Sequence, residues 1–223
     1  MSCGLWTLEQ AHNDRGNPMA IGYLYFDLGK VLLDFDHKIG CQQVAAISDC
    51  SAEKVNSILF ESGLEDLFET GQLDAAEFHK QFCEASGGSP SLTEFLNACS
   101  DIFSMKTTMM PVIGQLTAVG FPMGILSNTC SAHWGHVFNR FRFLQNSFRD
   151  YILSYESKSM KPDLKIYEDA IKTANLPANE IFFIDDKPEN VEGAIAAGID
   201  AVLFTTAEQA IVDLQSRGVR FNL

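Results

Sequence analysis

The strongest constraint on the fold is a repeated alternation of short apolar runs with segments that have the periodicity of helices. The apolar runs have the length of buried strands and lie at Gly22–Phe26, Met123–Leu126, Tyr151–Leu153, Ile181–Ile184 and Ala201–Phe204. The helical patterns lie at Pro111–Val119, Ala132–Phe141, Asp163–Ala174, Glu189–Ala197 and Ala207–Arg217. This alternation is typical of a parallel sheet covered by helices on both faces. We therefore predict an α/β fold with a five-stranded parallel sheet.

A long interruption of this alternation predicts a second structural unit. The segment 39–105 has helical patterns but no convincing strand, with capping-box spacing at Asp74–Glu77 and Ser91–Glu94. Because it follows the first predicted strand, we expect a lobe of four helices over the carboxyl edge of the sheet, where ligands bind. The predicted domains are an N-terminal extension (1–19), a core (20–38 and 106–223) and a helical cap (39–105). Met19 is a second candidate start.

The composition argues against several classes of function. The 29 acidic and 16 basic residues give a formal net charge of −13, which repels nucleic acid because no basic patch offsets it. No segment approaches the roughly 20 apolar residues that span a bilayer, and the first residues lack the pattern of a secretory signal. The six cysteines form no CxxC pair, which favours small buried apolar roles in a reducing compartment. We expect a cytoplasmic protein with no nucleic-acid or membrane partner, and the sequence predicts no oligomeric state.

Polar residues follow the predicted strands at the points where the strands end. They are Asp27, the pair Ser127 and Asn128, Lys161, and the pair Asp185 and Asp186. Because the carboxyl ends of parallel strands meet at one edge of a sheet, we expect these residues to converge on one crevice. Neighbouring carboxylates stay ionised together when a cation joins them, and Mg²⁺ prefers such oxygen ligands. The sequence therefore predicts a magnesium site.

A phosphate group bound at such a site gives the other polar residues a role. Ser127 can donate its hydroxyl to the phosphate oxygens, and Lys161 can neutralise charge on the transferring group. Asp27 stands alone after its strand and is best placed to attack phosphorus, forming an aspartyl-phosphate that water then hydrolyses. These residues predict hydrolysis of a phosphate ester.

Four sequence segments taken together resemble the motifs of a known family. They are FDLGKVLLDFD at Phe26–Asp36, ILSN at Ile125–Asn128, Lys161 in KPD, and FIDDKPENVEGA at Phe183–Ala194. In this order they resemble the motifs of haloacid dehalogenase-like hydrolases. The resemblance implies a Rossmann-like core with a helical cap inserted after the first motif. The FDLG segment resembles a subgroup that includes sugar-phosphate phosphatases, and a small cap points to a small phosphorylated metabolite as the substrate.

The resemblance also implies a set of metal ligands. Asp27 would be both the nucleophile and a ligand of Mg²⁺, and the backbone carbonyl of Gly29 would be a second ligand. Asp186 would bind the metal directly. Asp185 would act through a water molecule.

The remaining family motifs imply the residues that hold the phosphate. Ser127 and Lys161 would bind it, with help from the backbone of Asn128. Asn190 would fix the loop after the acidic pair without touching the substrate.

One position departs from the family pattern. Phosphatases of this family usually carry a second aspartate two residues after the nucleophile, which protonates the leaving group, and here that position is Gly29. We hypothesise that a metal-bound water or a residue of the cap replaces it. An alternative is a catalytically reduced protein that binds phosphorylated ligands or partners without efficient turnover.

Two further alternatives are less compatible with the sequence. A response-regulator receiver domain also combines clustered acids, a hydroxyl and a lysine, but this chain is too long and its acidic pair comes last. A dehalogenase of the same family needs no magnesium, whereas the acidic pair after IFFI argues for a metal.

Overall fold

The structure, a computed structural model, describes residues 21–220, so the predicted extension and Met19 lie outside the described residues. Its core is a five-stranded sheet in which all neighbouring strands are parallel. In spatial order the strands are β5 (Asp150–Leu153), β4 (Met123–Ser127), β1 (Tyr23–Phe26), β6 (Ile181–Asp185) and β7 (Asp200–Leu203). Each strand overlaps one of the apolar runs, so the predicted fold class is confirmed.

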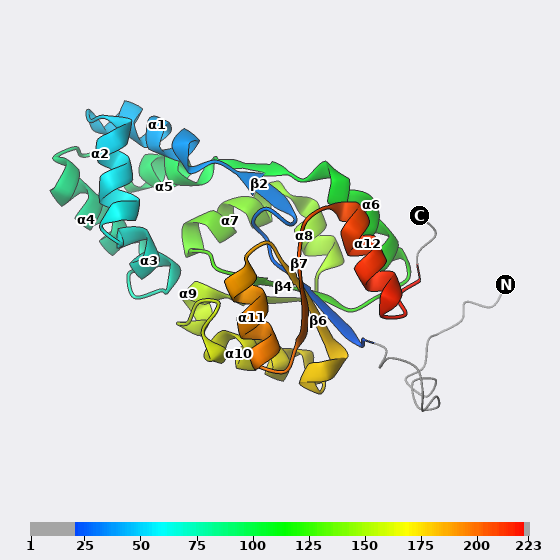
Figure 1. The fold of residues 1–223 in the computed structure, drawn as a ribbon. Helices are drawn as coiled ribbons and strands as arrows, with labels where there is room; N and C mark the ends of the chain where they lie inside the picture. The colour runs from blue at the N-terminus through cyan, green and yellow to red at the C-terminus, as the bar shows by residue number, and fades with distance from the viewer. Residues whose placement is uncertain (1–20, 221–223) are drawn as a thin grey trace.

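Helices cover both faces of the sheet (Figure 1). The alternation of side chains along β1 shows how the two faces differ, because Leu24 and Phe26 belong to one apolar cluster and Tyr23 and Tyr25 to another. The first cluster packs against α6 (Met110–Ala118), α7 (Ser131–Arg140), α8 (Arg142–Ser147) and α12 (Ala207–Ser216). The second packs against α10 (Leu164–Ala174) and α11 (Pro188–Ala196). The short helices α8 and α9 (Ser154–Ser157) were not predicted from the sequence.

A helical lobe, here called the cap, is inserted between two short antiparallel strands (Figure 1). These strands are β2 (Leu33–Phe35) and β3 (Phe103–Met105). The cap helices are α1 (His37–Ser48), α2 (Ala52–Asn56), which continues as a π-helical stretch, η2 (Ser57–Glu61), then α3 (Leu64–Glu69), α4 (Ala75–Ser86) and α5 (Leu92–Ser100).

Two details of the predicted cap are wrong. The cap has five α-helices instead of four, and β3 lies in the segment that was expected to contain no strand. Strands of three residues are too short to give a readable alternation. Their pairing depends instead on tertiary contacts such as that between the rings of Phe35 and Phe103, whose centroids are 5.8 Å apart.

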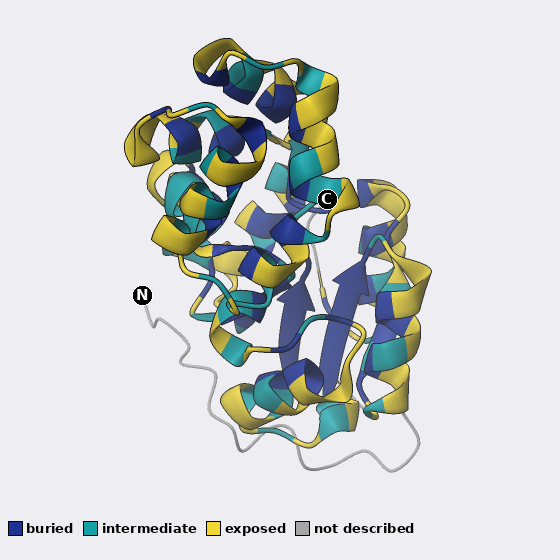
Figure 2. Ribbon diagram, turned by 90° about the vertical axis from the view of Figure 1, so that its left-hand side faces the viewer, coloured by how far each residue is buried: buried dark blue, intermediate teal, exposed yellow. Residues whose placement is uncertain are grey.

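The cap has an apolar core of its own, built largely from phenylalanines. Phe68, Phe78, Phe82 and Phe95 are buried, and their rings stack in pairs with centroids 4.4 Å (Phe68 and Phe78) and 4.6 Å (Phe82 and Phe95) apart. Figure 2 shows buried residues on the inner faces of the cap helices and throughout the central strands. A full capping box is formed at Ser91, as its spacing to Glu94 predicts.

The described cysteines form no disulfide. Cys41, Cys99 and Cys130 are buried, and the first two belong to cap helices that pack around the phenylalanine core. No helix within residues 21–220 is both long and apolar enough to cross a membrane.

Candidate active site

The topology brings the ends of the central strands together. β1 lies between β4 and β6, and Phe26 pairs with both Ile125 and Ile184. Asp27 continues β1, and its backbone N–H donates to the carbonyl oxygen of Ile184 at 2.9 Å. By the same register, Asp27 lies level with Asp185, the last residue of β6. Residues far apart in the chain therefore meet at the carboxyl edge of the sheet.

Lys161 joins the two carboxylates. Its Nζ lies 2.6 Å from Asp27 Oδ1 and 2.6 Å from Asp185 Oδ2, and it donates to the carbonyl oxygen of Leu126 at 2.8 Å. Only 1% of the lysine side chain is exposed. Since an ammonium group has three protons and here has three acceptors, its position is fixed by the surrounding protein.

Burial and charge oppose each other in this cluster. Burial raises the pKa of Asp27 to about 6, even though Lys161 lowers it. Burial lowers the pKa of Lys161, but Asp27 and Asp185 outweigh this effect and hold that pKa above its ordinary value. Burial, followed by the charge of Asp185, also raises the pKa of Asp186. Because the carboxylates outnumber the single ammonium, the cluster favours a further cation.

The carboxylates are placed to hold that cation. Oxygens of Asp27, Asp185 and Asp186 all lie within 4.8 Å of one another, which suits ligands at about 2.0–2.1 Å around Mg²⁺. Asp185 is fully buried and already accepts hydrogen bonds from the Lys187 N–H at 2.8 Å and from the Asn190 amide at 3.0 and 3.1 Å. Among the described residues, Asp185 thus has the most hydrogen-bond partners of the three carboxylates, and Asp186 is the most exposed of them.

At the end of β4, the side chain of Asn128 has a role that the sequence did not indicate. The Asn128 side chain donates to the Lys161 carbonyl oxygen at 3.0 Å and accepts from the Lys161 N–H at 2.8 Å. Asn128 therefore fixes the loop that carries the lysine, a role that no sequence motif signals. Ser127 is buried, and its hydroxyl donates only weakly, at 3.3 Å, to the carbonyl oxygen of Asn128.

The Ser127 hydroxyl and the Gly29 carbonyl oxygen have hydrogen-bond partners other than the carboxylates. Within the described part of the chain, no hydrogen bond joins the Ser127 hydroxyl or the Gly29 carbonyl to Asp27, Asp185 or Asp186. The Gly29 carbonyl oxygen accepts the N–H of Val31 at 2.7 Å. The structure thus brings together the carboxylates and the lysine of the predicted site, with the hydroxyl and the carbonyl nearby in the chain.

The sequence of this chain matches the model of a known protein family over the whole candidate site. A family model described as haloacid dehalogenase-like hydrolase matches residues 26–198, a range that contains every candidate site residue. The chain belongs to the haloacid dehalogenase-like hydrolase family. The resemblance of its four motifs to this family is therefore confirmed.

Similar proteins of the haloacid dehalogenase-like family include phosphatases. A sesquiterpene phosphatase of Aspergillus oryzae is 24% identical over 192 residues, covering 85% of this chain and 93% of the relative. A D-ribitol-5-phosphate phosphatase of Bacteroides thetaiotaomicron is 24% identical over 177 residues, covering 75% and 84% of the two chains. A family enzyme of the same bacterium, solved in complex with magnesium and inorganic phosphate, is 26% identical with a TM-score of 0.74, covering 83% of this chain and 95% of that one.

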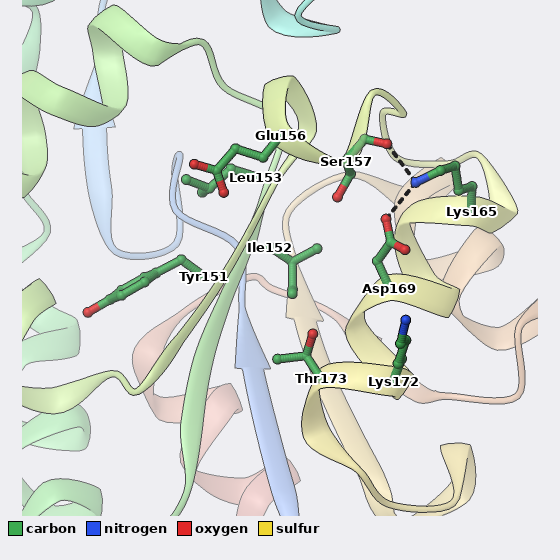
Figure 3. Close-up of a pocket in the computed structure, with 9 residues that line it drawn as sticks. All are labelled: Tyr151, Ile152, Leu153, Glu156, Ser157, Lys165, Asp169, Lys172 and Thr173. Carbon is green, nitrogen blue, oxygen red and sulfur yellow. Dashed lines mark hydrogen bonds and ion pairs between the residues drawn. The ribbon is translucent and has the colours of Figure 1, made fainter.

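A hollow elsewhere on the molecule is separate from this site. It has a volume of about 480 Å³ and lies between β5 and α10 (Figure 3). One wall is formed by Lys165, which donates to the Ser157 carbonyl oxygen at 2.6 Å and pairs with Asp169 at 2.7 Å. None of its lining residues belongs to the carboxylate cluster, so this hollow is not part of the candidate active site of this hydrolase.

Gly29, where many hydrolases of the family carry an aspartate, is closely packed against an aromatic ring. A Cβ atom at this position would lie 2.7 Å from Cε1 of Phe35. The Phe35 ring is itself held between His37 and Phe103, with centroids 4.9 and 5.8 Å away, and Lys30 Nζ lies 4.3 Å from its centroid. The ring therefore occupies the space that the side chain of an acid at position 29 would need.

Gly29→Ala is expected to lower the free energy of unfolding by about 1–3 kcal/mol, because the added methyl group overpacks the site against a ring that cannot move freely. Urea unfolding measures this effect. Gly114→Ala is the matched control, since a Cβ there meets nothing within 4 Å. Gly114 lies in the middle of α6, so its replacement should stabilise the helix. Equal unfolding free energies for the two variants would contradict the packing of Phe35.

The sequence analysis missed a cap residue that lies near the cluster. Glu69 ends α3, and the charges of Lys187, Asp27 and Lys161 all act on its carboxyl group. No motif marks Glu69, because its approach to the site depends on how the cap sits on the core.

Proposed function

We propose that this hydrolase is a magnesium-dependent phosphatase that cleaves a small phosphate monoester through an aspartyl-phosphate on Asp27. The observation that carries the proposal is the buried Lys161, which lies 2.6 Å from both Asp27 and Asp185. A lysine held in this way places one fixed positive charge beside the nucleophile, where the transferring phosphoryl group carries its negative charge.

The proposed metal site uses the remaining charge of the cluster. Asp27, Asp186 and the Gly29 carbonyl would hold Mg²⁺, and Asp185 would act from the outer sphere. This division is supported by the full hydrogen bonding of Asp185 and the partial exposure of Asp186. When bound, the cation would offset the negative charges of the carboxylates and the phosphate, so that one anion can approach another.

In the proposed first step, an oxygen of Asp27 attacks phosphorus as the bond to the ester oxygen breaks. The Ser127 hydroxyl and the backbone N–H of Asn128 would bind the phosphate oxygens, and the charge of Lys161 would offset the charge that they carry. Water then cleaves the bond between phosphorus and Asp27, which releases phosphate and restores the carboxylate.

The substrate class is supported by the relatives. Those with 24% identity are named for phosphates of a sesquiterpene and of D-ribitol, which are both small molecules. A small phosphorylated metabolite, such as a sugar or polyol phosphate, is therefore the proposed substrate. The alternative, a protein that binds phosphorylated ligands without turnover, is favoured only by the glycine at position 29.

A phosphate-release screen with and without Mg²⁺ tests the proposal. We expect turnover of sugar and polyol phosphates that stops when the metal is chelated. Asp186→Asn should raise the Mg²⁺ concentration for half-maximal rate by at least about tenfold, since even outer ligands of metal sites contribute this much to affinity. Asp169→Asn, a change at the Figure 3 hollow, is the control and should leave the requirement unchanged. Magnesium-dependent binding of phosphate esters with no release of phosphate from any of them would favour the alternative.

A further inference from the structure

The cap is fixed to the core at the end of α3. The Ser154 hydroxyl, which follows β5, donates to the Glu69 carbonyl oxygen at 2.6 Å. The same oxygen of Ser154 accepts the Thr129 N–H at 2.9 Å and lies 2.9 Å from the Thr129 carbonyl oxygen. A second contact follows, because Lys158 Nζ donates to the Gly71 carbonyl oxygen at 2.7 Å. These bonds place the backbone of Glu69 beside Thr129, only two residues beyond Ser127.

The Glu69 side chain belongs to the same end of α3 and lies within range of the charges at the carboxylate cluster. Its carboxyl group is close enough to Asp27, Lys161 and Lys187 for all three charges to act on it. Glu65, one turn earlier on α3, is directed elsewhere, with its carboxylate 3.8 Å from Nδ1 of the buried His133. Of these two carboxyl groups on α3, only that of Glu69 is acted on by the charge of Asp27.

The surroundings of Glu69 favour a carboxyl group that holds a proton. Burial, then Asp66 and Asp27, raise its pKa to about 7, although Lys187 and Lys161 lower it. Its carboxyl charge also acts on Glu65, on the same helix, and on Cys130 at the start of α7. A group with a pKa near neutrality can both donate and accept a proton at physiological pH.

We propose that Glu69 is the general acid and base of this site, in place of the aspartate that Gly29 replaces. This inference rests on the proposed phosphatase function. When Asp27 attacks phosphorus and the bond to the ester oxygen breaks, Glu69 gives its proton to that oxygen, so an alcohol leaves and Glu69 becomes a carboxylate. In the second step Glu69 takes a proton from the water that attacks the aspartyl-phosphate, and free phosphate and the original carboxyl group result.

The strongest rival for this role is His37, at the start of α1. The charge of Lys187 also acts on His37, so this residue lies near the site as well. Burial, followed by the charge of Lys30, lowers the pKa of His37 below its ordinary value, which disfavours the protonated imidazole. His37 is therefore a weaker candidate for the general acid than Glu69.

The test separates protonation of the leaving group from every other step. The experiment uses enzyme in excess over substrate, so that the measured rate is that of the first turnover, in which the leaving group departs. Two substrates are compared. One is 4-nitrophenyl phosphate, and the other is the polyol or sugar phosphate that the wild type hydrolyses fastest. Nitrophenolate can leave without being protonated, whereas the oxygen of an alkyl ester must receive a proton as it leaves. Glu69→Gln should slow alcohol release from the alkyl ester by about 100- to 10,000-fold and change nitrophenol release much less.

Glu65→Gln is the matched control, because it removes a buried carboxyl group from the same helix one turn away. It should leave the ratio of the two rates unchanged, and so should His37→Gln. Urea unfolding of each variant checks that the cap and core remain folded, and Glu69→Asp should recover part of the rate with the alkyl ester.

The outcomes are distinct. Equal slowing of both esters by Glu69→Gln, no slowing of either, or selective slowing by His37→Gln instead would overturn the role of Glu69. A wild type that releases nitrophenol but cleaves no alkyl phosphate would also overturn it, because no proton donor would then be acting. A wild type that cleaves neither ester in the presence of Mg²⁺ would instead contradict the proposed phosphatase function.

Discussion

Asp27→Asn is expected to reduce phosphate release by at least about 10,000-fold, because an amide cannot form the aspartyl-phosphate on which the proposed route depends. The measurement is magnesium-dependent phosphate release from the best substrate of the screen, together with the intact mass of acid-quenched protein. The wild type should show a fraction of molecules heavier by one phosphoryl group, and the variant should show none. A variant with near wild-type turnover would remove Asp27 from the mechanism.

The same substitution should stabilise the metal-free protein at neutral pH. The pKa of Asp27 is raised to about 6 from an ordinary 3.8, so the folded protein holds this proton more tightly than the unfolded chain. The resulting stabilisation is complete below the ordinary pKa and is lost as the pH rises through about 6. Asp27→Asn lacks this dependence, so between these pH values its unfolding free energy should gain about 2–3 kcal/mol relative to the wild type. If the unfolding free energies of the two proteins changed with pH in the same way, the burial of the Asp27 charge would be contradicted.

Lys161→Met is expected to be the most destabilising of these substitutions. It leaves the buried carboxylates of Asp27 and Asp185 beside each other with no cation between them, and an unpaired buried charge costs about 3–5 kcal/mol. Turnover should also fall by about 100- to 1,000-fold through loss of transition-state stabilisation. Urea unfolding in chelator and in excess Mg²⁺ measures the first effect, and the metal should restore part of the stability.

Lys165→Met is the matched control for this prediction. Lys165 forms an ion pair of similar length, 2.7 Å to Asp169, but 55% of its side chain is exposed. Exposed pairs contribute at most about 1 kcal/mol, so this variant should be nearly as stable as the wild type. Similar losses in the two variants would mean that burial does not govern the energy of the Lys161 pairs.

The part of the site that follows strand ends could be predicted from the sequence. Asp27 and Asp185 come directly after apolar runs, and the parallel sheet brings such positions to one edge whatever the details of packing. Their convergence depends only on strand order and register. For this reason the pattern of apolar and polar residues is enough to predict that these acids meet.

The supporting contacts could not be predicted, because they depend on tertiary packing. Asn128 holds the backbone of Lys161 across 33 positions of sequence, and neither residue carries a signal of the other. The ring of Phe35 fills the space beside Gly29 only because the short strands β2 and β3 pair. The end of α3 lies against the core because Ser154 donates to the Glu69 carbonyl oxygen, and a sequence pattern does not describe how one lobe packs on another.

The central place of β1 has a consequence for the synthesis of the protein. This strand is made before both of its partners, β4 and β6, which begin at Met123 and Ile181. On the ribosome, its apolar residues therefore remain unpaired until most of the chain has emerged, while the cap helices have their own core within a contiguous stretch. Partly made chains of this topology expose a strand that tends to aggregate. We therefore expect the nascent chain to carry an exposed strand, directly followed by the candidate residue Asp27, until both partner strands have been made.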